Sequence, residues 1–185
     1  MKRIRYIAIY GVLIIGLMGC KKEVANPDSS NLNVLPPLTH EGKNTFGCLV
    51  NGEVWVAYAP FTVGGTIALE GSYHSDIGYL HLRGNRKNND LNHNESINLR
   101  IENLFSSGTF TFYTNHHVSR GLVDYSDNFN CSNYYLDTNL IRESTITYFS
   151  LQKRIVSGTF EMDLVNPSCP GDTIKIREGR FDWCY

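Results

Sequence analysis

Cysteine offers the most direct chemistry in this 185-residue chain, which contains five of them. No two are spaced as C-x-x-C, so the pattern indicates neither a thiol redox motif nor a zinc ribbon. One cysteine, Cys20, ends an apolar stretch and is followed at once by two lysines. The other four lie beyond that stretch, at Cys48, Cys131, Cys169 and Cys184.

The segment before Cys20 has the layout of an export signal. Three basic side chains lie within the first five residues, and residues 6–19 carry no charge. As a helix these 14 residues would span about 21 Å, short of the ~30 Å of a bilayer core, so a cleaved signal fits better than a membrane span. Residues 17–20, "LMGC", resemble the bacterial lipobox. That resemblance implies cleavage between Gly19 and Cys20 and a diacylglyceryl group on the Cys20 thiol; the alternative is an uncleaved anchor with an incidental cysteine.

A lipid on Cys20 would hold the chain to a membrane in the cell envelope. Each buried CH₂ contributes about 0.8 kcal/mol, so the two or three chains of a bacterial lipoprotein would anchor it permanently. We expect the outer membrane, with the domain facing the periplasm or the surface. Removal of residues 1–19 takes away 3 of the 17 basic side chains and none of the 18 acidic ones, leaving a charge near −4. Nucleic acid is not expected as a partner, because phosphate contacts need basic side chains.

The four remaining cysteines predict disulfides, because an even number in an exported domain is typical of them. Cys131 and Cys169 both lie in polar segments, "DNFNCSN" and "NPSCPGD". Cys48 and Cys184 lie on the first and last expected strands, which would be neighbours if the sheet closes. Of the three possible connectivities we therefore favour 131–169 with 48–184. The alternative for Cys48 is a simple buried thiol.

The histidines do not form a recognisable metal site. His116 and His117 are adjacent, and neighbours on a strand point to opposite faces. His74 and His81 flank an expected hairpin that contains Asp76, without the spacing of a known zinc motif. We expect no metal and no cofactor.

No catalytic residues can be assigned from the sequence. The chain has no G-x-S-x-G nucleophile motif. Glu161 and Asp163 share the outer face of one expected strand, where carboxylates usually serve solubility. A glycosidase pair must instead converge on a sugar from separate places. The sequence therefore favours a protein that is not an enzyme.

Aromatic side chains are the better candidates for binding. Trp55 faces away from Val54 and Val56, and Tyr134-Tyr135 lies in a polar segment expected to be a loop. Trp and Tyr join a large apolar area to a polar group, so they can stack on sugars or anchor a protein contact. The alternative is that Trp55 faces the core of a two-layer sandwich.

The chain divides into three parts: a signal at 1–19, a lipidated cysteine and tether at 20–43, and one domain at 44–185. The tether contains three prolines and no hydrophobic period, and a flexible chain of this length has an end-to-end distance of very roughly 26 Å. Alternatively, residues 34–38 of the tether pack along the surface of the domain. The domain is large enough for a substantial core.

Alternating apolar residues predict an all-β domain. Asn51-Gly52 between "TFGCLV" and "EVWVAYA" is a strong hairpin signal. In "NESINLRIENLF" the alternation favours a strand over a helix. The expected fold is a single antiparallel β-sandwich or flattened barrel of nine to ten strands. The other expected strands lie around Ile67/Leu69, Leu80/Leu82, Phe110/Phe112, Ile146/Tyr148, Phe160/Met162/Leu164, Ile174/Ile176 and Phe181/Trp183/Tyr185.

Three stretches, at 44–56, 156–166 and 171–185, resemble an uncharacterised family of Bacteroidota lipoproteins, known as a domain of unknown function behind a lipobox signal. The middle of the domain is similar only loosely, and Cys184 departs from the family's ending. The resemblance implies an all-β envelope lipoprotein and no activity. We expect a binding or structural module for envelope glycan or protein; an envelope hydrolase acting on glycan or peptide is the alternative.

Overall fold

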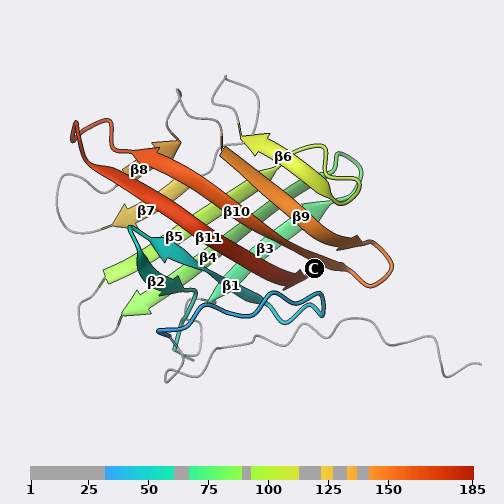
Figure 1. The fold of residues 1–185 in the computed structure, drawn as a ribbon. Coiled ribbons are helices and arrows are strands. Elements are labelled where there is room, and N and C mark those ends of the chain that lie inside the picture. Colours follow the sequence, from blue (N-terminus) through green and yellow to red (C-terminus); the bar gives the residue numbers. More distant parts are fainter. Residues whose placement is uncertain (1–31, 61–66, 89–92, 113–121, 127–132, 137–141) are drawn as a thin grey trace, which may run out of the picture.

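The regular secondary structure of the described residues consists of β-strands. The computed structural model describes residues 32–60, 67–88, 93–112, 122–126, 133–136 and 142–185 (Figure 1). Among these residues no helix is long and apolar enough to span a membrane. The strands are β1 (Thr45–Val50), β2 (Glu53–Val56), β3 (Leu69–His74), β4 (Tyr79–Asn88), β5 (His93–Ile101), β6 (Gly108–Phe112), β7 (Leu122–Ser126), β8 (Asn133–Leu136), β9 (Arg142–Ser150), β10 (Ile155–Val165) and β11 (Thr173–Cys184).

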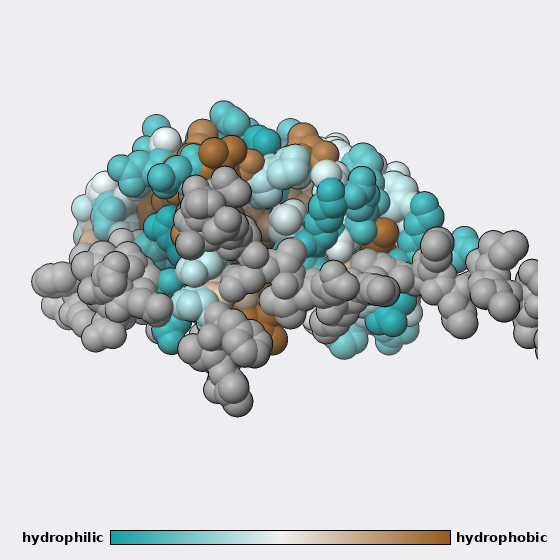
Figure 2. Space-filling view, turned by 90° about the horizontal axis from the view of Figure 1, so that it is seen from below, coloured by the Kyte–Doolittle hydropathy of each residue, from teal (hydrophilic) through white to brown (hydrophobic). Residues whose placement is uncertain are grey.

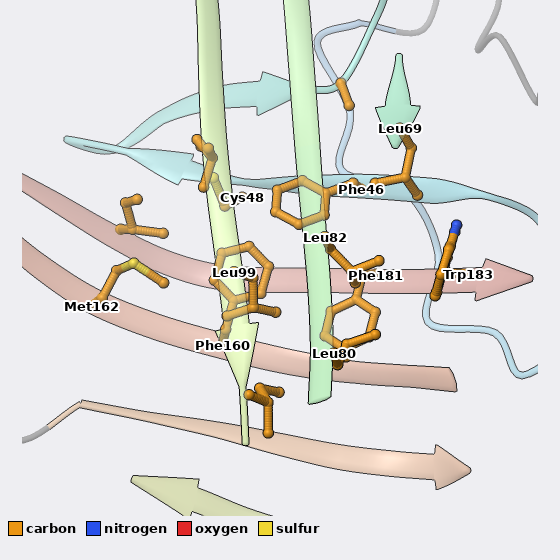
Figure 3. Packing of buried hydrophobic residues seen from close by; sticks show 14 of the residues in the cluster. Phe46, Cys48, Leu69, Leu80, Leu82, Leu99, Phe160, Met162, Phe181 and Trp183 are labelled. Atoms are coloured by element: carbon orange, nitrogen blue, oxygen red, sulfur yellow. The ribbon is translucent and has the colours of Figure 1, made fainter. Parts of the chain in front are cut away.

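The strands pair antiparallel and form two layers. Their order is β2-β1-β11-β10-β8-β7-β5-β4-β3, with β9 pairing both β10 and β6. The sheet divides along β10, because residues 155–161 of this strand pair with β9 whereas residues 164–165 pair with β8. Figure 3 shows β4 and β5 crossing β1, β11, β10 and β9 steeply, as in orthogonal packing of two sheets. The predicted antiparallel sandwich is confirmed, and among the described residues β2 and β3 do not pair to close a barrel.

Most of the predicted strands are present. The ambiguous segment "NESINLRIENLF" forms β5, which confirms a strand in place of a helix. Two short strands, β7 and β8, were not predicted, and the two expected strands at the C-terminus are one continuous strand, β11. The count is therefore eleven, where nine to ten were expected.

The β1–β2 hairpin forms where it was predicted. Asn51 and Gly52 both have positive φ, 52° and 90°, as a type I′ turn requires. Asn51 also fastens the turn to β11, since its N–H donates to the carbonyl of Lys175 and its side-chain oxygen accepts from the N–H of Lys175. The first and last strands are hydrogen-bonded neighbours, as the sequence suggested.

A bulge in the middle of β11 reverses which side chains point inward. Before it, Ile174 and Ile176 face the core; after it, Phe181 and Trp183 do. The register of β10 with β11 shifts between Phe160 and Met162, and the bulge contains a residue with positive φ, Glu178 at 50°. One strand can therefore place even-numbered residues in the core at one end and odd-numbered residues at the other.

The predicted Cys48–Cys184 disulfide is wrong. Cys48 is a free, buried thiol in the core cluster. Its β1 neighbours Gly47 and Leu49 pair with Arg180 and Arg177, so Cys48 lies opposite the bulge, several residues from Cys184 along β11. A disulfide requires Cα atoms within about 7 Å. The bulge also places Cys184 on the face opposite to Trp183, away from the core that contains Cys48.

The space between the two layers is filled by large apolar side chains (Figure 3). A buried Leu, Val or Phe contributes about 1.5–3 kcal/mol to stability. Phe46 lies at the centre of an aromatic group, with its ring centroid 5.0 Å from that of Phe160 and 6.1 Å from that of Trp55. Fully or nearly fully buried members of the core include Phe46, Cys48, Leu80, Leu82, Leu99, Phe160, Met162, Phe181 and Trp183.

Residues 32–44, which we call the strap, run along the sandwich before β1. Three consecutive backbone N–H groups, of Glu41, Gly42 and Lys43, donate to the carboxylate of Asp182 at 2.9–3.1 Å. The hydroxyls of Thr39 and Ser157 donate to the same carboxylate, at 2.5 and 2.7 Å. Asp182 is fully buried although it lies on the outer side of β11, because the strap covers it.

This end of the expected tether is therefore held against the domain. Of the segment proposed to pack on the surface, Leu35 and Pro36 are half-buried, whereas Val34 and Leu38 are exposed. Figure 2 views the molecule from this side and shows a mainly hydrophilic surface with small hydrophobic areas. Burial would raise the pKa of the Asp182 carboxyl, but the hydrogen bonds that it accepts outweigh burial and lower it.

Candidate functional site

The main cleft opens at one end of the sandwich, between its two layers. Its volume is about 410 Å³. It lies on the left of Figure 1, where the β1–β2 turn, the end of β4, the start of β5, β8 and the start of β11 come together. Both layers contribute to its wall. The lining residues are Val50, Asn51, Glu53, Val54, Trp55, Arg86, Glu95, Ser96, Ile97, Tyr134, Asp172, Ile174 and Ile176.

Three of the lining side chains hold one another in place across the two layers. A single carboxylate oxygen of Glu95 accepts from the indole N–H of Trp55 at 2.7 Å and from Nε of Arg86 at 2.6 Å. The Arg86 guanidinium lies 5.6 Å from the centre of the Trp55 ring, within cation–π range. Arg86 and Glu95 are directly opposite on β4 and β5, whereas Trp55 comes from β2. These contacts fix an ion pair and an aromatic edge before any ligand arrives.

A second polar pair lies on the other side of the cleft. The Tyr134 hydroxyl donates to a carboxylate oxygen of Asp172 at 2.5 Å. Tyr134 belongs to β8 and is buried, while Asp172 is exposed in the turn before β11. The backbone of Asp172 is fixed within that turn, because its N–H donates to the carbonyl of Cys169 and its carbonyl accepts from Asn166. The orientation of this carboxylate is thus set by the fold.

The rest of the wall is aliphatic. Ile174 and Ile176 come from β11, Ile97 from β5, and Val50 and Val54 from the first hairpin. A few polar groups placed among apolar walls are typical of small-molecule sites, whose volumes run from about 300 to 1,000 Å³. The cleft therefore has both the size and the lining of a ligand site.

The structure brings together two of the three predicted binding residues. Trp55 and Tyr134 both line the cleft, with 3% and 6% of their surface exposed. The prediction that Tyr134-Tyr135 lies in a loop is wrong, because both belong to β8, and consecutive strand residues face opposite ways. Tyr135 is accordingly outside the cleft and 41% exposed. Trp55 packs in the core through its ring, as the alternative proposed, and its N–H donates to Glu95 in the wall of the cleft.

The other sequence candidates do not converge. The described residues contain no group of three or more His, Cys, Asp or Glu that could hold a metal. His81 contacts Asn98, and His74 lies against Tyr79. On the outer face of β10, Asp163 forms an ion pair with Arg177. The predicted positions outside the described residues are Gly19, Cys20, His116, His117 and Cys131.

The disulfide between Cys131 and Cys169 stays a prediction, because Cys131 is not among the described residues. Cys169 lies in the turn after β10, where its N–H donates to the carbonyl of Asn166.

Sequence reasoning missed the polar half of the cleft. Asp172 lies far from Arg86 and Glu95 in the sequence, and none of the three belongs to a ligand-binding motif. The available signal was position: Arg86 and Glu95 lie between two predicted antiparallel strands, where directly opposite charges often pair. Asp172 carried no such signal, because its place in the cleft depends on the position of β8.

A second hollow, of about 290 Å³, lies on the outer face of β9, β10 and β11. Its lining includes Glu143 and Glu161, which are directly opposite on neighbouring strands, and Glu178, which pairs with Arg180. Like charges that face each other across a sheet are unfavourable. This hollow has fewer apolar walls than the cleft, so we take the cleft as the candidate site.

The fold and the cleft define an open, all-β sandwich with a ligand-sized site at one end. No protein-family model, curated protein or solved structure matches the chain. The geometry of the cleft is therefore the basis for the functional argument.

Proposed function

We propose that this protein is a lipid-anchored envelope lipoprotein whose sandwich binds a ligand in the cleft. The ligand would be a small molecule or a protruding group of an envelope glycan or protein. The observation that carries the proposal is the preformed cleft of about 410 Å³, in which Trp55, Glu95 and Arg86 are already fixed by mutual contacts. Preorganised side chains favour binding because they are already ordered, so little conformational entropy is lost when the ligand binds.

The anchor is the second part of the proposal. It rests on the likeness of residues 17–20 to a lipobox and on the family resemblance, which both indicate an envelope lipoprotein. A lipid on Cys20 would keep the binding site near the membrane at a high local concentration, and this requires no chemistry from the domain.

The adjacent tyrosines of β8 provide a matched test of the cleft. We expect Tyr134→Ala to weaken binding by at least about 2 kcal/mol, the scale of an interface hot spot, and Tyr135→Ala to leave it nearly unchanged. Binding partners would be found by a glycan array and by pull-down from solubilised envelopes, and affinities measured by calorimetry. Tyr134→Phe, which keeps the ring and removes the hydroxyl bonded to Asp172, separates a loss of binding from a loss of folding. Equal affinities for the two alanine variants would refute the proposal.

One observation favours hydrolysis as a second candidate. Glu95 and Asp172 approach the same cleft from separate elements, as the two carboxylates of a glycosidase must. Both are already hydrogen-bonded, however: Glu95 to Trp55 and Arg86, and Asp172 to Tyr134. A panel of glycan and peptide substrates tests this candidate. Turnover that is abolished by Glu95→Gln or Asp172→Asn would establish the hydrolase in place of the binding module.

A further inference from the structure

We infer that the cleft selects ligands that carry a protonated amine on a short aliphatic arm. This inference rests on the proposed binding function and names the ligand chemistry of the same site. It follows from three features of the cleft: the balance of charge in its lining, the ion pair of Arg86 with Glu95, and its aliphatic wall.

Charge in the lining is unbalanced toward the negative side. Of the described residues, the lining contains three carboxylates, of Glu53, Glu95 and Asp172, and one basic side chain, Arg86. Arg86 forms an ion pair with Glu95, with an N–O distance of 2.6 Å. Its Nη1 also donates to the Val54 carbonyl at 3.4 Å. Glu95 and Arg86 therefore largely neutralise each other.

The other two carboxylates have no cationic partner among the described residues. Asp172 accepts one hydrogen bond, from the Tyr134 hydroxyl, and this leaves most of its acceptor capacity for a ligand. Glu53 is exposed at the start of β2, directly opposite Val50. Neither forms an ion pair with any residue that the structure describes. An ammonium group has three N–H donors and would supply both the missing charge and the missing hydrogen bonds.

The wall between these carboxylates suits the arm of such a ligand. Ile174 and Ile176 follow Asp172 along the chain, and Val50 and Val54 belong to the hairpin that carries Glu53. An aliphatic arm of about five or six carbons would bury apolar surface against these side chains while its amine pairs with Asp172, and Glu53 adds negative charge at the other end of the wall. An anionic ligand of the same shape would be repelled, so charge gives the specificity and the wall gives the affinity.

Three probes of equal length test the inference: 1-hexylamine, 1-hexanol and hexanoate, titrated into the purified protein and followed by NMR. We expect 1-hexylamine to bind at least tenfold more tightly than 1-hexanol, and hexanoate to bind most weakly. The advantage of the amine should shrink between about 20 and 300 mM salt, because the carboxylates are solvent-accessible. Asp172→Asn should weaken amine binding at least fivefold and leave 1-hexanol binding unchanged.

Two further variants complete the design. Glu53→Gln changes an exposed side chain, and it repeats the test should Asp172→Asn fail to fold. Glu161→Gln, on the outer face of β10, is the matched control and should leave all three affinities unchanged.

Each outcome decides between the proposals. Equal binding of 1-hexylamine and 1-hexanol would overturn the inference and leave the cleft as a binding site. Amine binding that neither Asp172→Asn nor Glu53→Gln weakens would also overturn it, because the amine would then bind elsewhere. If no probe shifts cleft resonances at millimolar concentration, the inference fails, whereas the proposed binding function is decided separately by the comparison of Tyr134→Ala with Tyr135→Ala.

Discussion

Replacement of Asp182 by asparagine should lower the stability of the fold strongly, although it hardly changes the shape of the side chain. Asparagine has the size of aspartate, but only one of its two terminal atoms can accept a hydrogen bond. One Asp182 oxygen accepts from the N–H of Gly42 and the hydroxyl of Ser157, and the other accepts from Thr39 and two further backbone N–H groups. The asparagine amide is less unfavourable when its nitrogen takes the place of the oxygen that accepts from Gly42 and Ser157, because that oxygen accepts two hydrogen bonds and the other accepts three. Ser157 can then rotate to accept, but the Gly42 N–H loses this acceptor.

The expected loss follows from these contacts. A buried donor that loses its acceptor costs about 1–3 kcal/mol. The remaining bonds to residue 182 change from charge-assisted to neutral, and hydrogen bonds to charged groups contribute roughly 1 kcal/mol more than neutral ones. We therefore expect Asp182→Asn to lower the free energy of unfolding by about 3 kcal/mol. For a chain of this size that corresponds to a fall in Tm of about 6–12 °C.

Urea unfolding and amide hydrogen exchange together test this reasoning. Exchange should accelerate at Glu41, Gly42 and Lys43, whose N–H groups bond to Asp182. Glu178→Gln is the matched control, because it removes an exposed ion pair with Arg180, and such pairs are worth at most about 1 kcal/mol. Equal stability of the two variants, or unchanged exchange in the strap, would refute the argument.

The same carboxyl predicts a pH dependence. Its pKa in the folded protein is lowered, so its contribution is complete above the ordinary carboxyl pKa of about 3.9. The contribution is lost as the pH falls through the lower, folded-state pKa. The difference in stability between the parent protein and Asp182→Asn should therefore be constant near neutral pH and shrink below about pH 4.

Three further predictions concern the cysteines. Cys20→Ala should abolish labelling by a radioactive fatty acid and leave precursor or unanchored product, and equal labelling of the parent protein would contradict lipidation. Cys48 should react with thiol reagents only on unfolding, because burial raises its pKa to about 12; rapid reaction in the folded protein would contradict its position in the core. Cys131→Ser should lower Tm in oxidising buffer, since a native disulfide contributes about 2–5 kcal/mol, whereas unchanged Tm would argue against the 131–169 bond.

The strands could be predicted because their signals are local. Alternation of apolar residues requires only that one face of each strand be buried, and the Asn51-Gly52 turn requires only positive φ at two positions. Both signals are complete within a few residues. The short strands β7 and β8 carry no long alternation, and they were missed for that reason.

The facing of Cys184 could not be predicted, because it depends on a bulge. Before the bulge the inward residues of β11 are even-numbered, and after it they are odd-numbered. Gly179, inside β11 beside Glu178, is a local sign of a bulge, but the sign does not tell which way the side chains beyond it face, because that depends on how β10 and β1 pair with β11. A one-residue shift reverses every side chain beyond it, so the correct strand neighbours still led to a wrong disulfide.

Of the residues that line the cleft, the sequence pointed only to the aromatic ones, Trp55 and Tyr134. Trp55 and Tyr134 were chosen by residue type, which a sequence shows directly. Their partners Glu95 and Asp172 are ordinary surface carboxylates until β5 and β11 bring them beside those rings. Only the packing of the two layers distinguishes them from the other acidic residues of the chain.

One strand, β11, connects the two parts of the molecule that matter most for the proposed function. Its first residues line the cleft, and Asp182 near its end binds the strap. From Ile176 to Asp182 is about 20 Å at ~3.3 Å per residue, so the strap is fastened well away from the cleft mouth. If Cys20 carries the lipid, the chain from the membrane reaches the domain along the strap, which packs from Pro36 on β1 to its fastening at Asp182. The strap would then limit how freely the domain turns and would keep the open end of the sandwich away from the point of attachment, where a ligand can reach it.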